Sequence, residues 1–319
     1  MSGLCAELNG AWARDGVAVT FGVFDGVHRG HLHVIERLKS VAEKYGYRSA
    51  VVTLSNHPLT VLRPHVPLRL ITSVRERLEL LRATGVDVVV PINFSRELSL
   101  LSAADFMTAL RDCMNMMHFV VGPDFALGHN REGTSERLAE LGSQLGYSFE
   151  AAEPLEIDGA PARSTGIRQA LSAGDPELAA RLLGRPFVVD GPVVEGEGRG
   201  SGLLGFPTAN IGLGPLQALP ADGIYASWLS VGGRRYPAAT SIGIKPTFHS
   251  DGPRVVEAFV LDFDGNLYGE HVRLEFVSWL RQQERFDCVD DLVQQIASDV
   301  ERTRNALTAT PTEQADLQL

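Results

Sequence analysis

The sequence predicts an α/β protein of two domains, in which a Rossmann-like domain with a parallel sheet precedes a small β-barrel with a C-terminal helix. Two observations support this division. Strand-like and helix-like segments alternate in the first half, whereas the second half consists of short apolar runs separated by Gly, Pro and Asp. The helix-breaking string Gly184-Arg185-Pro186 lies between the two patterns. We therefore predict domains over residues 1–184 and 185–308, and a disordered polar tail over residues 309–319.

The elements of the first half follow from apolar spacing. Val17, Val19 and Phe21 alternate as in a strand, and Gly46 ends the helix that follows. That helix is predicted from the spacing of Leu32, Ile35, Leu38, Ala42 and Tyr45. The next predicted elements are a strand over Ser49–Leu54, a helix after the capping box Ser73-x-x-Glu76, a strand over Val86–Val90, a helix near Ala103–Cys113 and a strand over Phe119–Val121. Such repeats imply a parallel sheet with helices on both faces.

The first half ends with a helix, for which Asp175-Pro176 is the predicted N-cap and first residue and Leu183 the end. Shorter elements follow in the second half. The predicted strands of the barrel are Phe187–Val194, Ile224–Val231, Tyr236–Ile242, Val255–Leu261 and Val272–Phe276. The final helix is predicted from one apolar stripe, formed by Val289, Leu292, Val293, Ile296 and Val300.

Composition limits the classes of function. The chain is 44% hydrophobic and 21% charged, and its net charge of −10 argues against general nucleic-acid binding. No signal-peptide core and no apolar run of about 18 residues is present. The three cysteines, Cys5, Cys113 and Cys288, form no disulfide framework or metal-binding pair in sequence, which favours a reducing cytoplasm. We expect a monomer or weak homo-oligomer that acts on small molecules.

A string of glycines and histidines joins the first predicted strand to the first helix. It reads Gly22-Val23-Phe24-Asp25-Gly26-Val27-His28-Arg29-Gly30-His31. A helix start offers unpaired N–H groups and a positive dipole end, so it suits phosphate. His28 and His31 could grip a triphosphate there, and the glycines let backbone approach closely. An isolated pair of this kind could also be a surface pair or half of a metal site, but no third zinc ligand is evident nearby.

Ser164-Thr165-Gly166-Ile167-Arg168 begins another helical stretch. Its hydroxyls and guanidinium suit a leaving pyrophosphate. Ser-Thr before a helix is more often only a cap, so the string gains weight from its pairing with the histidine motif.

The run Gly196–Asn210 is dense in glycine, which lets backbone N–H groups surround phosphates. It could instead be a flexible hairpin loop. Gly200-x-Gly202-x-x-Gly205 matches a dinucleotide fingerprint, which we reject because Phe206-Pro207 and not a helix follows. Thr208 and Asn210 are two apart on an extended segment, so both could supply oxygen ligands to Mg²⁺.

Glu257 is the acidic residue of interest in the second half. It shares the odd positions of its strand with Val255, Phe259 and Leu261, where a charge is costly unless it is used or paired. The alternative is an edge-strand glutamate that faces water.

Together with Val121-Gly122-Pro123-Asp124-Phe125-x-x-Gly128, these strings resemble the bacterial bifunctional riboflavin kinase/FMN adenylyltransferase (FAD synthetase) family from about Val17 to Arg304. The resemblance implies that ATP and Mg²⁺ serve two reactions, riboflavin to FMN in the barrel and FMN to FAD in a nucleotidylyltransferase domain. The residues that it implies for catalysis are His28, His31 and Glu257; for nucleotide and phosphate Gly22, Phe24, Asp25, Gly30, Ser164, Thr165, Arg168, Gly198, Gly200 and Gly202; for flavin Asp124, Phe125, Arg285 and Phe286; and for the metal Thr208 and Asn210.

The sequence departs from the family pattern in its first half. Ser55-Asn56-His57-Pro58 stands where the family has Asp-Pro-His-Pro, and Arg163 to Arg168 stands for Ser-Ser-Thr-Arg-Ile-Arg. Leu127 replaces a phenylalanine. A working kinase with an impaired or altered adenylyltransferase domain is therefore the alternative. A flavin-binding sensor without turnover is disfavoured because Glu257, Thr208 and Asn210 are all present.

Overall fold

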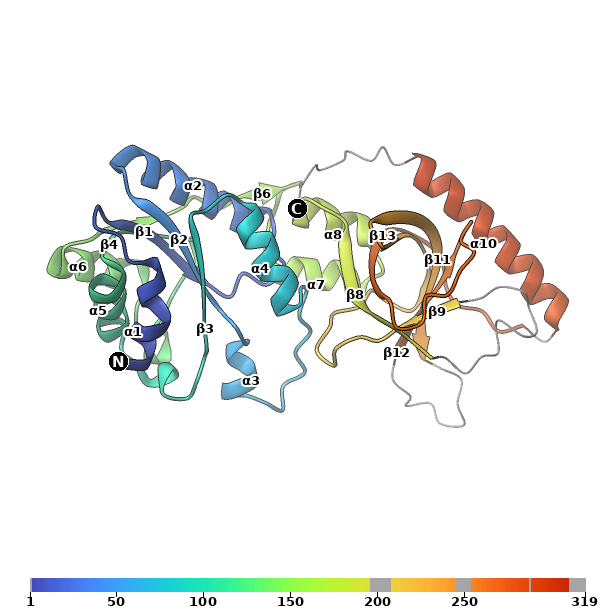
Figure 1. Ribbon diagram of the computed structural model, residues 1–319, viewed down its shortest axis with the longest axis horizontal. Helices are drawn as coiled ribbons and strands as arrows, with labels where there is room; N and C mark the ends of the chain where they lie inside the picture. The colour runs from blue at the N-terminus through green and yellow to red at the C-terminus, as the bar shows by residue number, and fades with distance from the viewer. Residues whose placement is uncertain (1, 196–207, 245–253, 287, 310–319) are drawn as a thin grey trace. The chain divides into compact units, whose positions relative to one another are not determined.

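The structure is a computed structural model that describes residues 2–195, 208–244, 254–286 and 288–309, and it divides into two compact units (Figure 1). Among these residues, the first unit comprises 2–68 and 72–163, and the second comprises 69–71 and 164–309. The predicted fold class is confirmed, since the first unit holds a parallel sheet and the second a closed barrel.

The sheet of the first unit has the strand order β3-β2-β1-β4-β5, and every neighbouring pair is parallel. Its strands are β1 (Val17–Gly22), β2 (Arg48–Leu54), β3 (Val88–Ile92), β4 (Met116–Val121) and β5 (Ser148–Ala151). Strand β5 was not predicted because it is short and only partly buried. A two-stranded sheet of β6 (Glu156–Ile157) and β7 (Ala160–Pro161) follows it.

Helices cover both faces of this sheet, as alternating strand residues require. On one face α1 (Ser2–Leu8), α5 (Ala103–Met114) and α6 (Ser135–Leu145) share a core with Val17 and Val19. On the other face α2 (Arg29–Tyr45) and α4 (Val74–Ala83) pack around Ala18. A short helix, α3 (Pro58–Leu62), follows β2.

The cysteines require a correction. Cys5 of α1 and Cys113 of α5 form a disulfide, although they are 108 residues apart in sequence. The expectation that the chain lacks disulfides is therefore wrong, because α1 packs on α5 and brings the two Cα atoms within 5.4 Å. Cys288 is free and exposed.

Two short helices belong to the second unit. They are α7 (Ser164–Ser172) and α8 (Pro176–Leu183), and α8 packs against strands of the barrel. Asp175 caps α8 by accepting a hydrogen bond from the Leu178 N–H at 2.8 Å. The division by compactness thus falls before Ser164, while the predicted boundary at residues 184 and 185 stays a prediction about the functional modules.

The barrel closes in the order β10-β11-β12-β9-β8-β13, with antiparallel pairs throughout. Its strands are β8 (Phe187–Val194), β9 (Thr208–Ile211), β10 (Gly223–Val231), β11 (Arg234–Ile244), β12 (Arg254–Val260) and β13 (His271–Arg281). The five predicted strands are present, and β9 completes the closure. Buried side chains alternate with partly exposed ones along these strands, so one set fills the interior.

The final helix, α10 (Val289–Ala309), lies beside the barrel and packs on β10, β11 and β13. Its buried residues are Asp299, Thr303 and Leu307. The predicted helix is present, but its apolar stripe is not its most buried face: Val289 is 55% exposed, and the other four members are only partly buried. A buried ion pair of Asp299, described below, explains this choice of face. The helix also reaches Ala309, and the rest of the predicted tail lies outside the described residues.

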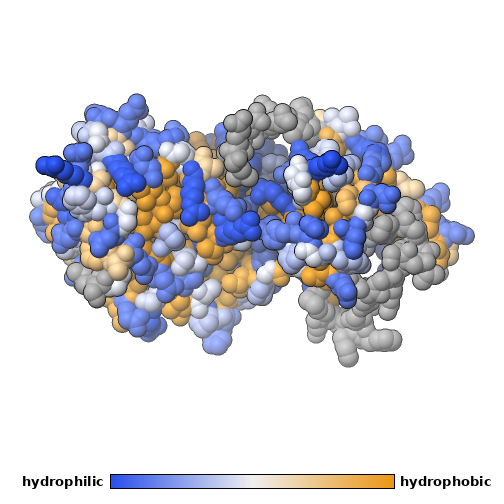
Figure 2. All heavy atoms as spheres, in the orientation of Figure 1, coloured by the Kyte–Doolittle hydropathy of each residue, from blue (hydrophilic) through white to orange (hydrophobic). Residues whose placement is uncertain are grey.

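None of the helices in the described part of the chain is long and apolar enough to span a lipid bilayer. Figure 2 shows hydrophilic side chains over much of the drawn face, with hydrophobic patches between them.

Candidate active sites

The histidine string forms a strained turn between β1 and α2. Phe24 and Val27 have positive φ angles of 53° and 38°, which bulky residues rarely adopt. The turn ends at His28, which is the N-cap of α2 and whose Nδ1 accepts a hydrogen bond from the His31 N–H at 3.3 Å. The rings of His28 and His31 are stacked, with centroids 3.5 Å apart. Both predicted imidazoles therefore lie together at the helix start.

A buried polar cluster holds this turn in place. The Asp25 carboxylate is 2% exposed and accepts hydrogen bonds from the N–H and hydroxyl of Thr72, at 3.2 and 3.4 Å. The Gly26 N–H donates to Thr72 Oγ1 at 3.1 Å. Arg77 is 1% exposed and donates to the Leu54 carbonyl. Burial lowers the pKa of the Arg77 guanidinium, and the Asp25 carboxylate opposes that shift. Strain of this kind persists only where the surroundings over-determine it.

The other residues predicted here for the nucleotide site lie in this turn or at its two ends. A Cβ at Gly30 would lie 2.4 Å from the Ala162 carbonyl oxygen, so this position accepts only glycine. Phe24 packs into the core beneath α2, and its ring contacts that of His31 at 5.0 Å. Gly22 lies against the Phe24 ring. The structure thus places Phe24 and Asp25 as supports of the turn, and their contact with a nucleotide stays a prediction.

The flavin-side string follows β4. Phe125 packs edge-on against Phe119 and Phe21, at 5.8 and 6.2 Å between ring centroids. Asp124 is exposed and forms an ion pair with Arg163 at 2.5 Å. Arg163 belongs to the string that departs from the family pattern, and its guanidinium pairs with the Asp124 carboxylate.

The other departure, Ser55-Asn56-His57-Pro58, is tied to the end of β3. Asn56 Nδ2 donates to the Phe94 carbonyl at 2.9 Å, and Asn56 Oδ1 accepts from the Phe94 N–H at 2.8 Å. The N–H of Ser55 donates to the Ile92 carbonyl at 2.9 Å. His57 caps α3 by accepting from the Leu59 N–H. These bonds give the loop a defined conformation although Ser55 and Asn56 replace the family's aspartate and proline.

Ser164, Thr165 and Arg168 lie at the start of α7, in the second compact unit. Arg168 Nε donates to the Arg69 carbonyl at 2.6 Å, within the same unit. The histidines belong to the first unit, so phosphate binding by these three residues stays a prediction.

Three strands of the barrel align the predicted residues Asn210 and Glu257 in one row with Ser241. Asn210 of β9 lies directly opposite Glu257 of β12, and Glu257 lies opposite Ser241 of β11. Residues opposite each other in antiparallel strands project to the same face, with Cβ atoms about 5 Å apart. All three side chains are partly exposed, while the alternate residues Val256 and Ala258 fill the interior. The odd positions of β12 are therefore the outer face, and the premise that Glu257 lies on the buried face is wrong.

The predicted metal ligands fit a hard cation. Thr208 and Asn210 are the first and third residues of β9, so both project to the outer face beside Glu257. Asn210 Oδ1 is buried and accepts no hydrogen bond from any residue that the structure describes. A buried amide oxygen in this state costs free energy unless a ligand completes it, and Mg²⁺ prefers such oxygen ligands.

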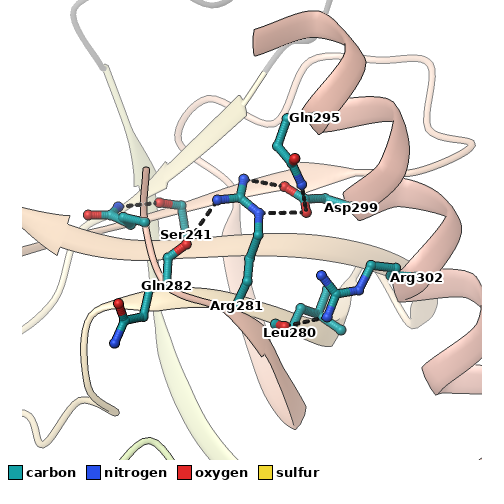
Figure 3. A network of polar contacts seen from close by, with 8 residues as sticks. Ser241, Leu280, Arg281, Gln282, Gln295, Asp299 and Arg302 are labelled. Atoms are coloured by element: carbon teal, nitrogen blue, oxygen red, sulfur yellow. Dashed lines mark hydrogen bonds and ion pairs between the residues drawn. The ribbon is translucent and has the colours of Figure 1, made fainter. Parts of the chain in front are cut away.

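An ion-pair network fixes the end of β13 against α10 (Figure 3). Arg281 forms two hydrogen bonds with Asp299, at 2.8 and 2.6 Å, and Gln295 donates to the same carboxylate at 3.1 Å. The Asp299 hydrogen bonds raise the pKa of the Arg281 guanidinium. Arg302 donates to the Leu280 carbonyl. The predicted flavin residues Arg285 and Phe286 follow on the chain before α10, with Arg285 exposed and Phe286 partly buried.

Gly198, Gly200 and Gly202 lie outside the described residues, so their predicted role is not placed. Sequence reasoning missed Thr72, Arg77, Ser241 and Gln283. Thr72 directly precedes a recognised capping box, in which Ser73 accepts from the Glu76 N–H at 3.1 Å. No local signal linked Thr72 to a turn 46 residues earlier.

Comparisons with known protein families match both halves of the chain. The model of a family described as FAD synthetase matches residues 11–166. The model of a family described as riboflavin kinase matches residues 183–307.

Individual relatives are similar over most of their length. Proteins named bifunctional riboflavin kinase/FMN adenylyltransferase are 37% identical in Pseudomonas fluorescens (91% of this chain and 92% of the relative) and 34% identical in Bacillus subtilis (88% and 89%). The protein of that name in Escherichia coli K12 is 33% identical over 90% of this chain and 91% of its own. A crystal structure from Streptococcus pneumoniae, described as a macrolide-efflux protein, has a TM-score of 0.84 at 31% identity and covers 94% of this chain and 97% of its own.

Proposed function

The chain belongs to the bifunctional riboflavin kinase/FMN adenylyltransferase family, and we propose on that premise that its barrel phosphorylates riboflavin and its first domain adenylylates FMN. The proposal rests on one observation: the residues proposed for the two reactions lie in different compact units. The histidine pair lies in the first compact unit, and Glu257 lies beside Asn210 in the second. Both family models match, so nothing in the comparisons favours a chain with one impaired half.

We propose that Glu257 is the general base of the kinase reaction. The ribityl 5′-hydroxyl oxygen attacks the γ-phosphorus of ATP, its proton passes to the Glu257 carboxylate, and ADP leaves. Thr208 and Asn210 would hold Mg²⁺, which neutralises charge on the phosphate oxygens. The register supports this assignment because it sets Asn210 about 5 Å from Glu257, measured between Cβ atoms.

We propose that the histidine turn stabilises charge during adenylyl transfer. A phosphate oxygen of FMN attacks the α-phosphorus of ATP and pyrophosphate leaves, so no protein nucleophile is required. Because His28 Nδ1 accepts the His31 N–H, the neutral His28 ring carries its proton on Nε2. That nitrogen can donate to a phosphate oxygen at the positive end of the α2 dipole.

Two substitutions test the division of labour. Glu257→Gln should lower FMN formation from riboflavin at least about 100-fold, as expected for loss of a general base, and leave FAD formation from added FMN unchanged. His28→Asn keeps a good helix cap but removes the imidazole, so it should do the reverse. Chromatography of the flavins after incubation with ATP and Mg²⁺ measures both reactions. Loss of both activities in either folded variant would refute the two-site assignment.

The remaining partner and location assignments stay predictions. A net charge of −10 supports small-molecule partners over nucleic acid, and a monomer or weak homo-oligomer is still proposed. A cytoplasmic location follows from the substrates ATP and FMN, whereas the Cys5–Cys113 disulfide removes the cysteine argument for it.

A further inference from the structure

The polar row on the barrel continues beyond Glu257. Ser241 lies opposite Glu257 across β11 and β12. Gln283, which follows β13, donates from Nε2 to Ser241 Oγ at 2.7 Å. The row therefore runs from Asn210 through Glu257 and Ser241 to Gln283. Asn210 and Glu257 serve the metal and the proton in the proposed reaction, which leaves Ser241 and Gln283 without a role.

The position of Gln283 depends on a glycine. A Cβ built on Gly243 would lie 2.0 Å from Gln283 Oε1 and 2.5 Å from its Cδ. Gly243 and Ser241 are two apart on β11, so they share a face. Gln283 thus lies across the space that Gly243 leaves open and reaches the serine from there.

The segment that carries Gln283 is anchored on its other side. The two hydrogen bonds between Arg281 and Asp299, together with the bond from Arg302 to Leu280, fix the end of β13 to α10 (Figure 3). The side chain of Arg281 is 14% exposed and that of Asp299 is 6% exposed, so water competes little for this pair. Gln283 is therefore held within two residues of a fixed point.

The geometry of phosphoryl transfer sets the direction of the acceptor. The attacking and leaving oxygens lie roughly in line with the phosphorus, so the nucleotide and the carbon chain of the acceptor extend on opposite sides. In the proposed kinase site, Thr208 and Asn210 would hold the metal and its nucleotide on the β9 side of Glu257. The acceptor then extends toward β11, where Ser241 is the next polar group.

We propose that Ser241 binds a hydroxyl of the polyol chain of the acceptor, and that Gln283 is its positioning residue. This inference rests on the proposed kinase function. Because Ser241 Oγ accepts the Gln283 amide, its own proton can be donated to a substrate hydroxyl. The site therefore selects flavins whose side chain carries hydroxyls besides the one that is phosphorylated. Arg285 and Phe286, where the ring is predicted to bind, follow Gln283 by two and three residues.

The test compares riboflavin with lumiflavin, which has the same ring system and a methyl group in place of the ribityl chain. Ser241→Ala should raise the KM for riboflavin about 5-fold, the effect of one neutral hydrogen bond. The Ki of lumiflavin against FMN formation, and the KM for ATP, should not change. Ser230→Ala, at a partly exposed serine elsewhere on the barrel wall, is the matched control and should match the parent.

Two further variants address Gln283. Gln283→Ala should raise the KM for riboflavin by a smaller factor than Ser241→Ala, because the serine keeps its hydroxyl. Gly243→Ala should reproduce the Gln283→Ala effect, since its methyl group displaces the glutamine. Both should leave the lumiflavin Ki unchanged.

The outcomes separate this inference from the proposed function. A riboflavin KM that is unchanged in Ser241→Ala, or a lumiflavin Ki that rises in parallel with it, would overturn the role of Ser241. If instead Glu257→Gln formed FMN at the parental rate, the proposed kinase site itself would be wrong. Thermal melts followed by circular dichroism check in every variant that the barrel is folded.

Discussion

At the scale of single residues, the histidine turn shows how a strained backbone is kept. Phe24 and Val27 adopt positive φ angles, and the backbone of the intervening turn is bonded to Thr72 from another part of the chain. The stacked imidazoles are thus positioned by a residue that has no reactive group of its own. Thr72 is 2% exposed, so its bonds are not shared with water.

Thr72→Val should lower the kcat of FAD formation on the order of 10-fold, because the buried Gly26 N–H loses its acceptor and the turn relaxes. Thr72→Ser keeps the hydroxyl and should restore most of that rate. FMN formation, measured in the same samples, should equal that of the parent in both variants. An equal loss of FAD formation in the serine and valine variants would contradict this prediction, because the serine variant keeps the hydroxyl that accepts from the Gly26 N–H.

Residue types and spacing placed His28 and His31 at one helix start and Thr208 and Asn210 on one strand, because each pair lies in one short string, and their chemical roles stay predictions. The face of Glu257 was predicted wrongly, since both faces of β12 carry apolar residues and only the barrel register shows which one is outside. Thr72 could not be predicted, because its partner Asp25 is 47 residues away in sequence.

At the scale of elements, strand β4 carries a buried histidine that lies near a glutamate of β5. His118 of β4 is 8% exposed, its Nε2 lies 3.8 Å from Glu150 of β5, and its ring stacks on Tyr45. Burial lowers the pKa of the His118 imidazole, with Glu150 opposing the shift and Arg37 adding to it. Folding therefore favours the neutral ring at this position.

The lowered pKa predicts a pH dependence of stability. Below the unfolded pKa of about 6.5 the unfolded chain binds the proton that the folded chain rejects, so the free energy of unfolding falls as the pH is lowered from 7.5 to 6. His118→Phe should make that fall shallower, because the phenyl ring does not titrate. Urea denaturation at the two pH values, followed by circular dichroism, measures the slopes. Identical slopes in parent and variant would contradict the prediction.

The helices illustrate what pattern alone can and cannot predict. The extent of α2 was predicted, because its cap, apolar spacing and terminal glycine agree. The buried face of α10 was not, because the ion pair between Asp299 and Arg281 faces the barrel and turns the apolar stripe partly toward solvent. From sequence alone, an aspartate such as Asp299 is expected on the surface. Its burial is explained only by its ion pair with Arg281 of β13.

At the scale of the whole molecule, the compact units and the predicted modules differ in where α7 and α8 belong. Both helices group with the barrel by contacts, although the predicted boundary assigns them to the first domain. An amphipathic helix reveals that it covers a core but not which core, so the sequence could not decide this assignment.

Truncation tests the assignment. A fragment of residues 164–319 should unfold cooperatively and form FMN, whereas residues 185–319 should have a lower Tm. The shorter fragment exposes the surface that α8 covers with Leu182 and Leu183, and burying each such side chain contributes roughly 1.5–3 kcal/mol. Thermal melts followed by circular dichroism compare the two fragments. Equal Tm values would show that α7 and α8 do not stabilise the barrel.

The loop after β2 is restrained by hydrogen bonds at a position where the family has a proline. A proline ring restricts its chain permanently, because the constraint is covalent. Asn56 occupies the family's proline position and achieves the same restraint through two hydrogen bonds to Phe94, which any competing polar group can exchange. The segment is therefore held by hydrogen bonds and not by a covalent ring. We expect any release of this loop to be reversible, because the two hydrogen bonds can form again.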